Sequence, residues 1–101
     1  MITSIDSNEF REVIKNGKVV IDLFATWCGP CKMLSPILDE ISEEIKEIKF
    51  YKVDVDDNQD IAREYNVMSI PTILIFNNGE LVNTIIGLKS KDYLVDQFKE
   101  V

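Results

Sequence analysis

Two cysteines separated by two residues are the most reactive feature of this sequence. Cys28 and Cys31 enclose Gly29 and Pro30, and the chain has no other cysteine. Two thiols at this spacing can form a disulfide and reopen it, because a thiolate attacks a disulfide sulfur through a mixed-disulfide intermediate. We expect Cys28 to attack a substrate disulfide and Cys31 to attack Cys28 in turn, releasing the reduced substrate. Pro30 puts no charge beside the thiolate, which favours a reductant over an oxidase or isomerase.

The segments on either side of the pair predict where the two thiols lie. Residues 19–24 form a nearly continuous apolar run, typical of a strand that is covered on both faces. Apolar residues then repeat at helical spacing over residues 34–48. We therefore expect Cys28 to begin a helix, where unpaired backbone N–H groups stabilise a thiolate. Cys31 follows nearly one turn later and is expected to be less exposed than Cys28.

The remaining segments predict one domain over residues 1–101 with the element order βαβαβαββα. Asn78-Gly79 is typical of a hairpin turn, and Asp6 or Ser7 and Ser90 can cap helices. In the last helix we expect Tyr93, Leu94 and Phe98 to face inward. The other expected elements are strands at 2–5, 50–55, 72–76 and 81–86 and helices at 7–16 and 59–65. This order indicates an α/β fold of three layers, in which helices cover both faces of a central mixed sheet.

Composition argues against several kinds of partner and site. Eleven basic and 18 acidic residues give a net charge of −7, which disfavours nucleic acid and anionic membranes. The chain has no histidine, so two cysteines cannot complete a four-ligand Cys/His zinc site or form a Cys–His pair, and we expect no metal. No apolar run is long enough to span a membrane, and no secretory signal is apparent. These features predict a cytoplasmic protein whose cysteines are chemical rather than structural.

Asp22 is unusual because it lies in the middle of the apolar run. A buried carboxylate is costly to keep charged, so burial would raise its pKa. We interpret Asp22 as a buried proton acceptor for Cys31; an aspartate that reaches water at a strand end is the alternative. Lys52, on the strand expected beside this one, is a candidate partner for Asp22, although a solvent-facing lysine is also compatible with its position.

Two further features suggest a surface for substrates. Trp27 precedes the nucleophile, where it could contact extended substrates or pack into the core. Pro71 precedes a predicted strand, a position where proline is tolerated. Alternatively, a cis peptide here would turn the chain and leave the Ile70 backbone free to pair with a substrate.

Together these motifs resemble the thioredoxin family over essentially the whole chain. The resemblance is carried by Trp27-Cys28-Gly29-Pro30-Cys31-Lys32-Met33, Pro36 to Glu40, Asp22, Val53 to Asp56, Ser69-Ile70-Pro71-Thr72, Asn78-Gly79 and Gly87. It implies a thioredoxin fold and a protein-disulfide reductase that has no bound cofactor and receives electrons from a thioredoxin reductase. We expect disulfide-containing clients and a monomer.

The resemblance also implies roles for individual residues. Pro71 should be cis and face the two sulfurs, and Lys52 should neighbour the buried Asp22. A shallow groove for substrate proteins should be rimmed by Trp27, Gly29, Pro30, Ser69, Ile70, Pro71, Gly87 and Leu88.

Two residues depart from the family pattern. Phe24 stands where many thioredoxins have a second tryptophan, and Ser69 replaces a frequent glycine. Both bear on partner choice rather than on the thiols. An alternative function of a different class is an interaction subunit that holds a partner in the groove whatever its redox state. A partner complex that survives replacement of both cysteines would identify this function.

Overall fold

Nine elements make up the computed structural model, which describes residues 1–101. Their order is β1 (Thr3–Ser4), α1 (Ser7–Val13), β2 (Lys18–Phe24), α2 (Gly29–Glu44), β3 (Lys49–Asp54), α3 (Gln59–Glu64), β4 (Thr72–Asn77), β5 (Glu80–Ile86) and α4 (Lys91–Lys99). The predicted order βαβαβαββα is confirmed. Most helices and strands begin or end a few residues away from the predicted positions.

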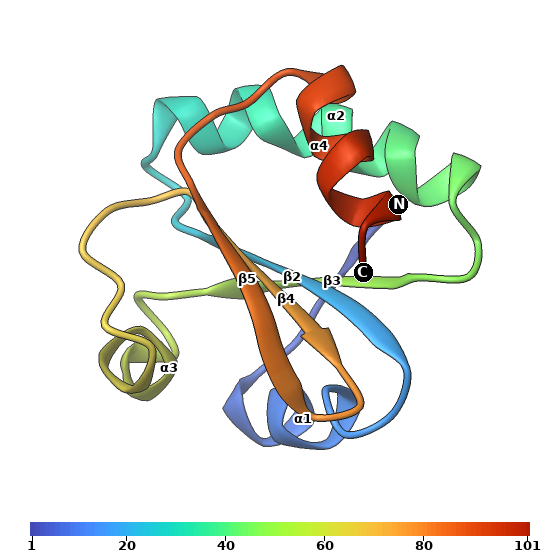
Figure 1. The fold of residues 1–101 in the computed structure, drawn as a ribbon. Coiled ribbons are helices and arrows are strands. Elements are labelled where there is room, and N and C mark those ends of the chain that lie inside the picture. Colours follow the sequence, from blue (N-terminus) through green and yellow to red (C-terminus); the bar gives the residue numbers. More distant parts are fainter.

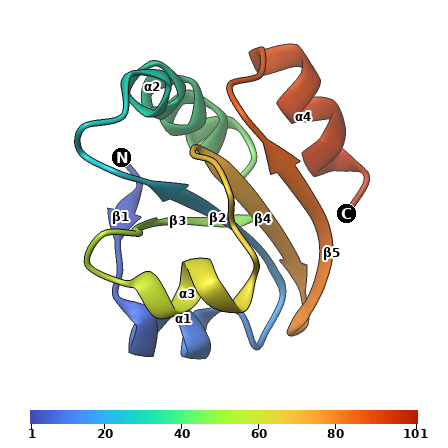
Figure 2. The same cartoon turned by 90° about the vertical axis from the view of Figure 1, so that its left-hand side faces the viewer.

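A five-stranded mixed sheet forms the middle layer. Its strand order is β1-β3-β2-β4-β5, with β1, β3 and β2 parallel and β4 antiparallel to both β2 and β5. Helices α2 and α4 cover one face of the sheet, and α1 and α3 cover the other (Figures 1 and 2). The expected three-layer α/β/α arrangement is therefore confirmed. None of the helices is long and apolar enough to cross a membrane.

Side chains of the central strand β2 alternate between the two halves of the core. Val19, Ile21 and Leu23 pack into the cluster beneath α1 and α3, whereas Val20 packs into the cluster beneath α2 and α4. Successive residues of a strand point to opposite faces. Asp22 therefore lies on the same face as Val20, beneath α2.

Capping and turn residues define where the elements begin and end. Asp6, rather than Ser7, caps α1: its carboxylate accepts from the Glu9 amide, and the Glu9 side chain accepts from the Asp6 amide. Asn78 and Gly79 adopt φ angles of 50° and 88° between β4 and β5, which confirms the predicted hairpin turn.

The last helix confirms one prediction and contradicts another. Ser90 caps α4 by accepting from the Tyr93 amide, and Leu94 and Phe98 are buried as expected. Tyr93, however, is 43% exposed. It precedes Leu94 by one residue, which turns it away from the buried face, and its ring lies 5.6 Å from the Lys89 ammonium instead.

The capping box makes a testable contribution to stability. Asp6→Ala should lower the free energy of unfolding by about 1 kcal/mol, because the Glu9 amide loses its acceptor. Asp6→Asn keeps an acceptor oxygen and should retain most of that stability. Urea unfolding of the two variants checks this, and equal losses in both would contradict the capping role.

Candidate active site

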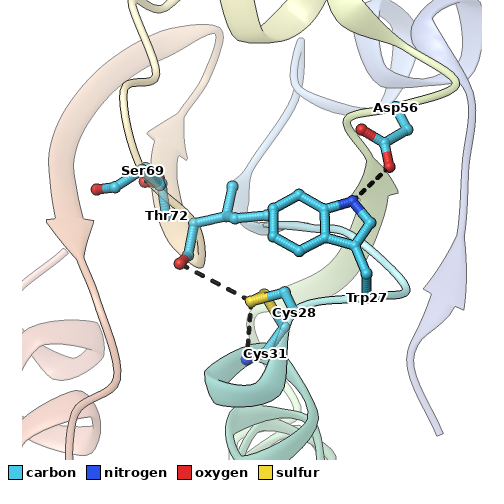
Figure 3. Close-up of a disulfide and its surroundings, with 7 residues drawn as sticks. Trp27, Cys28, Cys31, Asp56, Ser69 and Thr72 are labelled. Carbon is cyan, nitrogen blue, oxygen red and sulfur yellow. Dashed lines mark hydrogen bonds between the residues drawn. A yellow bond between two sulfur atoms is a disulfide. The ribbon is translucent and has the colours of Figure 1, made fainter.

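The two cysteines form a disulfide at the N-terminal end of α2 (Figure 3). Cys28 is the N-cap residue of this helix, and its sulfur accepts a hydrogen bond from the Cys31 amide at 3.2 Å. The loop from Ala25 to Cys28 closes with the Cys28 amide donating to the Ala25 carbonyl at 3.2 Å. Strand β2 and helix α2 are therefore joined by a short turn that delivers Cys28 directly to the helix end.

The helix end favours negative charge on the first sulfur. The first turn of α2 contains no acidic side chain, so the partial positive charge of its N–H groups is left unopposed. Such an end stabilises a thiolate once the disulfide is reduced. The prediction that Cys31 is the less exposed cysteine is wrong in this oxidised state, because both residues are 4% exposed. The disulfide joins the two residues, and both belong to one buried cluster against which Phe24, Val55 and Ile70 pack.

A loop from the other half of the chain lies opposite the disulfide. The segment between α3 and β4 reaches the N-terminal end of α2 (Figures 1 and 2), and the Ile70 carbonyl oxygen lies 3.8 Å from the Cys28 sulfur. The Ile70–Pro71 peptide is cis, as the family resemblance implied. The Thr72 hydroxyl donates to the Ser69 carbonyl at 2.6 Å, which fastens the turn.

An open, mostly apolar groove of about 430 Å³ runs beside Cys28. Trp27 forms one wall: its side chain is 68% exposed, and its indole N–H donates to Asp56 at 2.8 Å (Figure 3). An exposed tryptophan whose ring is fixed by a hydrogen bond offers a large contact surface, and it loses little conformational entropy when a partner binds. The lining residues are Trp27, Cys28, Gly29, Pro30, Val55, Ala62, Val67, Met68, Ser69 and Ile70.

The lining differs in part from the expected set. Pro71, Gly87 and Leu88 do not line this cavity, although the Gly87 amide donates to the Pro71 carbonyl at 2.8 Å and so lies beside the cis-proline turn. The sequence reasoning missed Val55, Ala62, Val67 and Met68. Val67 and Met68 directly precede Ser69 in the sequence, which was a usable signal. Ala62 lies outside the motifs, and Val55 lies inside the Val53 to Asp56 motif but is far in sequence from the two cysteines; both come to the groove only through the fold.

A second, smaller cavity of about 270 Å³ lies on the other side of the disulfide, where Cys31 rather than Cys28 lines it. The remaining lining residues are Asp22, Phe24, Ala25, Thr26, Lys32, Ser35 and Lys52. The two cysteines thus line different cavities: Cys28 lines the open apolar groove, and Cys31 lines the cavity that holds the buried carboxyl.

Asp22 is buried without a compensating hydrogen bond. The residue is 4% exposed, and its Oδ1 atom has no hydrogen-bond partner. Burial raises the pKa of Asp22 from 3.8 to about 7, the nearby Lys52 ammonium opposes this rise, and the like charge of Asp39 adds to it. Lys52 is the register neighbour of Asp22 across β2 and β3. The raised pKa confirms the prediction made from the sequence, and it lies close to neutral pH.

No group of three or more cysteine, histidine, aspartate and glutamate side chains is arranged to hold a metal ion. What this site can do is exchange disulfides at a helix end, beside an apolar groove and a titratable carboxyl.

Comparisons with known proteins agree with this geometry. The family model named Thioredoxin matches residues 1–100. A thioredoxin of Rickettsia felis is 50% identical over 93 residues, covering 90% of this chain and 89% of that protein. The crystal structure of mitochondrial thioredoxin 3 from Saccharomyces cerevisiae, in its oxidized form, has a TM-score of 0.91 at 41% identity and covers 99% of this chain and 95% of its own.

One relative is a larger, composite protein. A bifunctional thioredoxin reductase/thioredoxin of Mycobacterium leprae is 44% identical over 98 residues, which are 95% of this chain and 21% of that protein.

Burial of Asp22 predicts a distinctive dependence of stability on pH. Between its ordinary pKa of 3.8 and about 7, the folded protein keeps a proton on Asp22 that the unfolded chain releases. Rising pH therefore favours unfolding throughout this window, and above it the cost stays constant. At 1.36 kcal/mol per pH unit, the loss amounts to about 4 kcal/mol at most.

Asp22→Asn removes the titrating group and should not show this loss. The difference in unfolding free energy between the oxidised variant and the wild type should therefore grow in favour of the variant from pH 4 to pH 8. Urea unfolding at several pH values measures it. Parallel curves for the two proteins would rule out a carboxyl that titrates near pH 7.

Proposed function

The chain belongs to the thioredoxin family and is a thiol–disulfide oxidoreductase, and we propose that Cys28 and Cys31 serve to reduce disulfides in client proteins. The observation that carries this proposal is the disulfide at the N-terminal end of α2, with one of its sulfurs facing an open apolar groove. A disulfide at a helix end beside an open groove suits repeated thiol–disulfide exchange better than structural cross-linking.

In the first step Cys28 is the nucleophile. Its thiolate attacks one sulfur of the client disulfide, forming a new S–S bond while the other client sulfur leaves as a thiolate. The unopposed N–H groups at the start of α2 would stabilise the negative charge of the Cys28 thiolate. The position of Cys28 on the groove supports this role, since the client must approach from that side.

In the second step Cys31 resolves the mixed disulfide. Its sulfur attacks Cys28 and expels the second client thiolate, so two electrons pass to the client and the disulfide between Cys28 and Cys31 forms. Cys31 must first lose its thiol proton. Asp22 lines the same cavity as Cys31 and has a pKa of about 7, which suits a proton acceptor at neutral pH. Lys52, across the strand pair, would tune that acceptor.

The groove would hold the client while these steps occur. Its walls are mainly apolar, which suits an extended peptide that carries apolar side chains. The Ile70 backbone lies beside Cys28, so a client strand could pair with it there. Further contacts with the client would come from residues at or near this surface, namely Trp27, Gly29, Pro30, Ser69, Gly87 and Leu88.

Electrons would come from a thioredoxin reductase rather than from a bound cofactor. The fused reductase and thioredoxin of the Mycobacterium leprae relative support this pairing. A cycle that returns the cysteines to thiols requires a reducing compartment, which supports a cytoplasmic location and a role in electron transport. The disulfide and both cavities are complete within one chain, so the proposed steps need no second copy and we expect a monomer. The net charge of −7 favours proteins over nucleic acids or anionic membranes as partners.

Variants of the two cysteines should fail in different ways. Cys28→Ser should abolish the reduction of insulin supplied with a thioredoxin reductase, because no nucleophile faces the groove. Cys31→Ser should also stop turnover but accumulate mixed disulfides with clients, because resolution is lost. Non-reducing gels and mass spectrometry detect these adducts, and turnover by Cys28→Ser would overturn the mechanism.

Asp22→Asn should separate the two steps. Loss of the proton acceptor should slow release from the mixed disulfide by roughly 10²-fold or more, the usual range for general base catalysis, while the first attack changes little. Rapid-mixing kinetics with a fluorescent disulfide substrate resolves the steps. Equal effects on both steps, or none, would remove the proposed role of Asp22.

A further inference from the structure

The Lys52 side chain is turned toward an aromatic ring rather than onto the buried carboxyl. Its ammonium nitrogen lies 5.4 Å from the centroid of the Phe24 ring. The seven ion pairs in the structure, defined by contacts within 4.0 Å, do not include one between Lys52 and Asp22. A cation within about 6 Å of an aromatic face is attracted by the ring quadrupole. The ring of Phe24 is therefore a partner of this ammonium, and Asp22 is not its ion-pair partner.

The backbone explains why these three side chains meet. Asp22 and Phe24 are two residues apart on β2, so both point to the face covered by α2. Lys52 on β3 is the register partner of Asp22, and residues in register on neighbouring strands share a face. All three line the cavity that also contains Cys31. A long lysine stem starting opposite Asp22 thus ends over the ring of Phe24.

We propose that Phe24 is a positioning residue whose ring keeps the Lys52 ammonium inside the cavity, within electrostatic reach of Asp22 but outside ion-pair distance. The inference rests on the proposed role of Asp22 as proton acceptor and assigns a residue that controls it. Without the ring, the ammonium has a stronger alternative in water. Lys52 is partly exposed, an ammonium is strongly hydrated, and burying it against a carboxyl costs more than leaving it solvated.

The consequence for Asp22 follows from the charges that face it. Lys52 on β3 favours its ionised form, and Asp39 on α2 disfavours it. Lys32, also on α2, lines the cavity, and Cys31 adds a titrating group only when the disulfide is reduced. If Lys52 moves into water, the favourable contribution weakens while that of Asp39 remains. The pKa of Asp22 should then rise.

The test measures this titration directly in the oxidised protein, where Cys31 does not titrate. The Asp22 carboxyl carbon is followed by NMR from pH 5 to pH 10 in the wild type and in Phe24→Leu. The midpoint should rise by about one pH unit in Phe24→Leu, the lower end of the effect of a nearby opposite charge. Phe24→Tyr keeps an aromatic face and should keep the wild-type midpoint. If Phe24→Leu does not fold, Phe24→Met, which is flexible enough to fill the space, takes its place.

Variants of Lys52 test whether Phe24 acts through the lysine. Lys52→Gln should raise the Asp22 midpoint by itself, and adding Phe24→Leu to it should cause no further change. An unchanged or lowered midpoint in Phe24→Leu, or an equal shift in the Lys52→Gln background, would overturn the proposal, even if the variant is less stable. The lysine ε-methylene protons of the wild type should also be shifted upfield by the ring, and normal values would contradict it. None of these readouts depends on catalysis, so they stand apart from the Asp22→Asn kinetics that test the proposed function.

Discussion

The burial of strand β2 on both faces is the constraint on which the rest of this structure depends. Its alternating side chains fill both halves of the core, and the strand ends directly before the turn that carries Cys28. The same alternation puts Asp22 beneath α2, where it is almost fully buried. This one strand therefore contributes to both halves of the core, sets the position of Cys28 and carries the buried carboxyl.

The two sulfurs of the disulfide gain different surroundings from this arrangement. Cys28 lines an open apolar groove, whereas Cys31 lines the smaller cavity that also contains the Asp22 carboxyl. Equal burial of the two residues shows that overall exposure does not distinguish them. In the proposed mechanism, the difference between the two cysteines arises instead from which cavity each of them lines. The groove beside Cys28 would admit the client, and the cavity beside Cys31 contains the proposed proton acceptor.

This site carries a cost in stability. An ionised carboxyl without a hydrogen-bond partner is unfavourable in the core, and the unpaired Oδ1 atom of Asp22 has no structural benefit. Lys52 offsets part of this cost without forming a contact pair, so the carboxyl can still gain and lose a proton near neutral pH. A tight ion pair in the same place would stabilise the charged form and weaken Asp22 as a base.

The sequence by itself determined the order of elements, the place of Cys28 at a helix start and the burial of Asp22. Each of these follows from local pattern: apolar runs, helical spacing, the residues at turns and caps, and a carboxyl inside an apolar strand. The prediction that Tyr93 faces inward was wrong, because a rotation by one residue along the helix decides which side chains are buried.

Only the tertiary structure decided which distant residues share a cavity. Val55 and Ala62 reach the groove, and the Lys52 ammonium reaches the Phe24 ring, because strand register and the packing of α3 bring them there. The burial of the two cysteines likewise depends on Val55 and Ile70, which come from other segments and pack against their cluster. Local patterns report how a segment folds and which side it buries, whereas a cavity depends on the register between strands and the packing of separate segments.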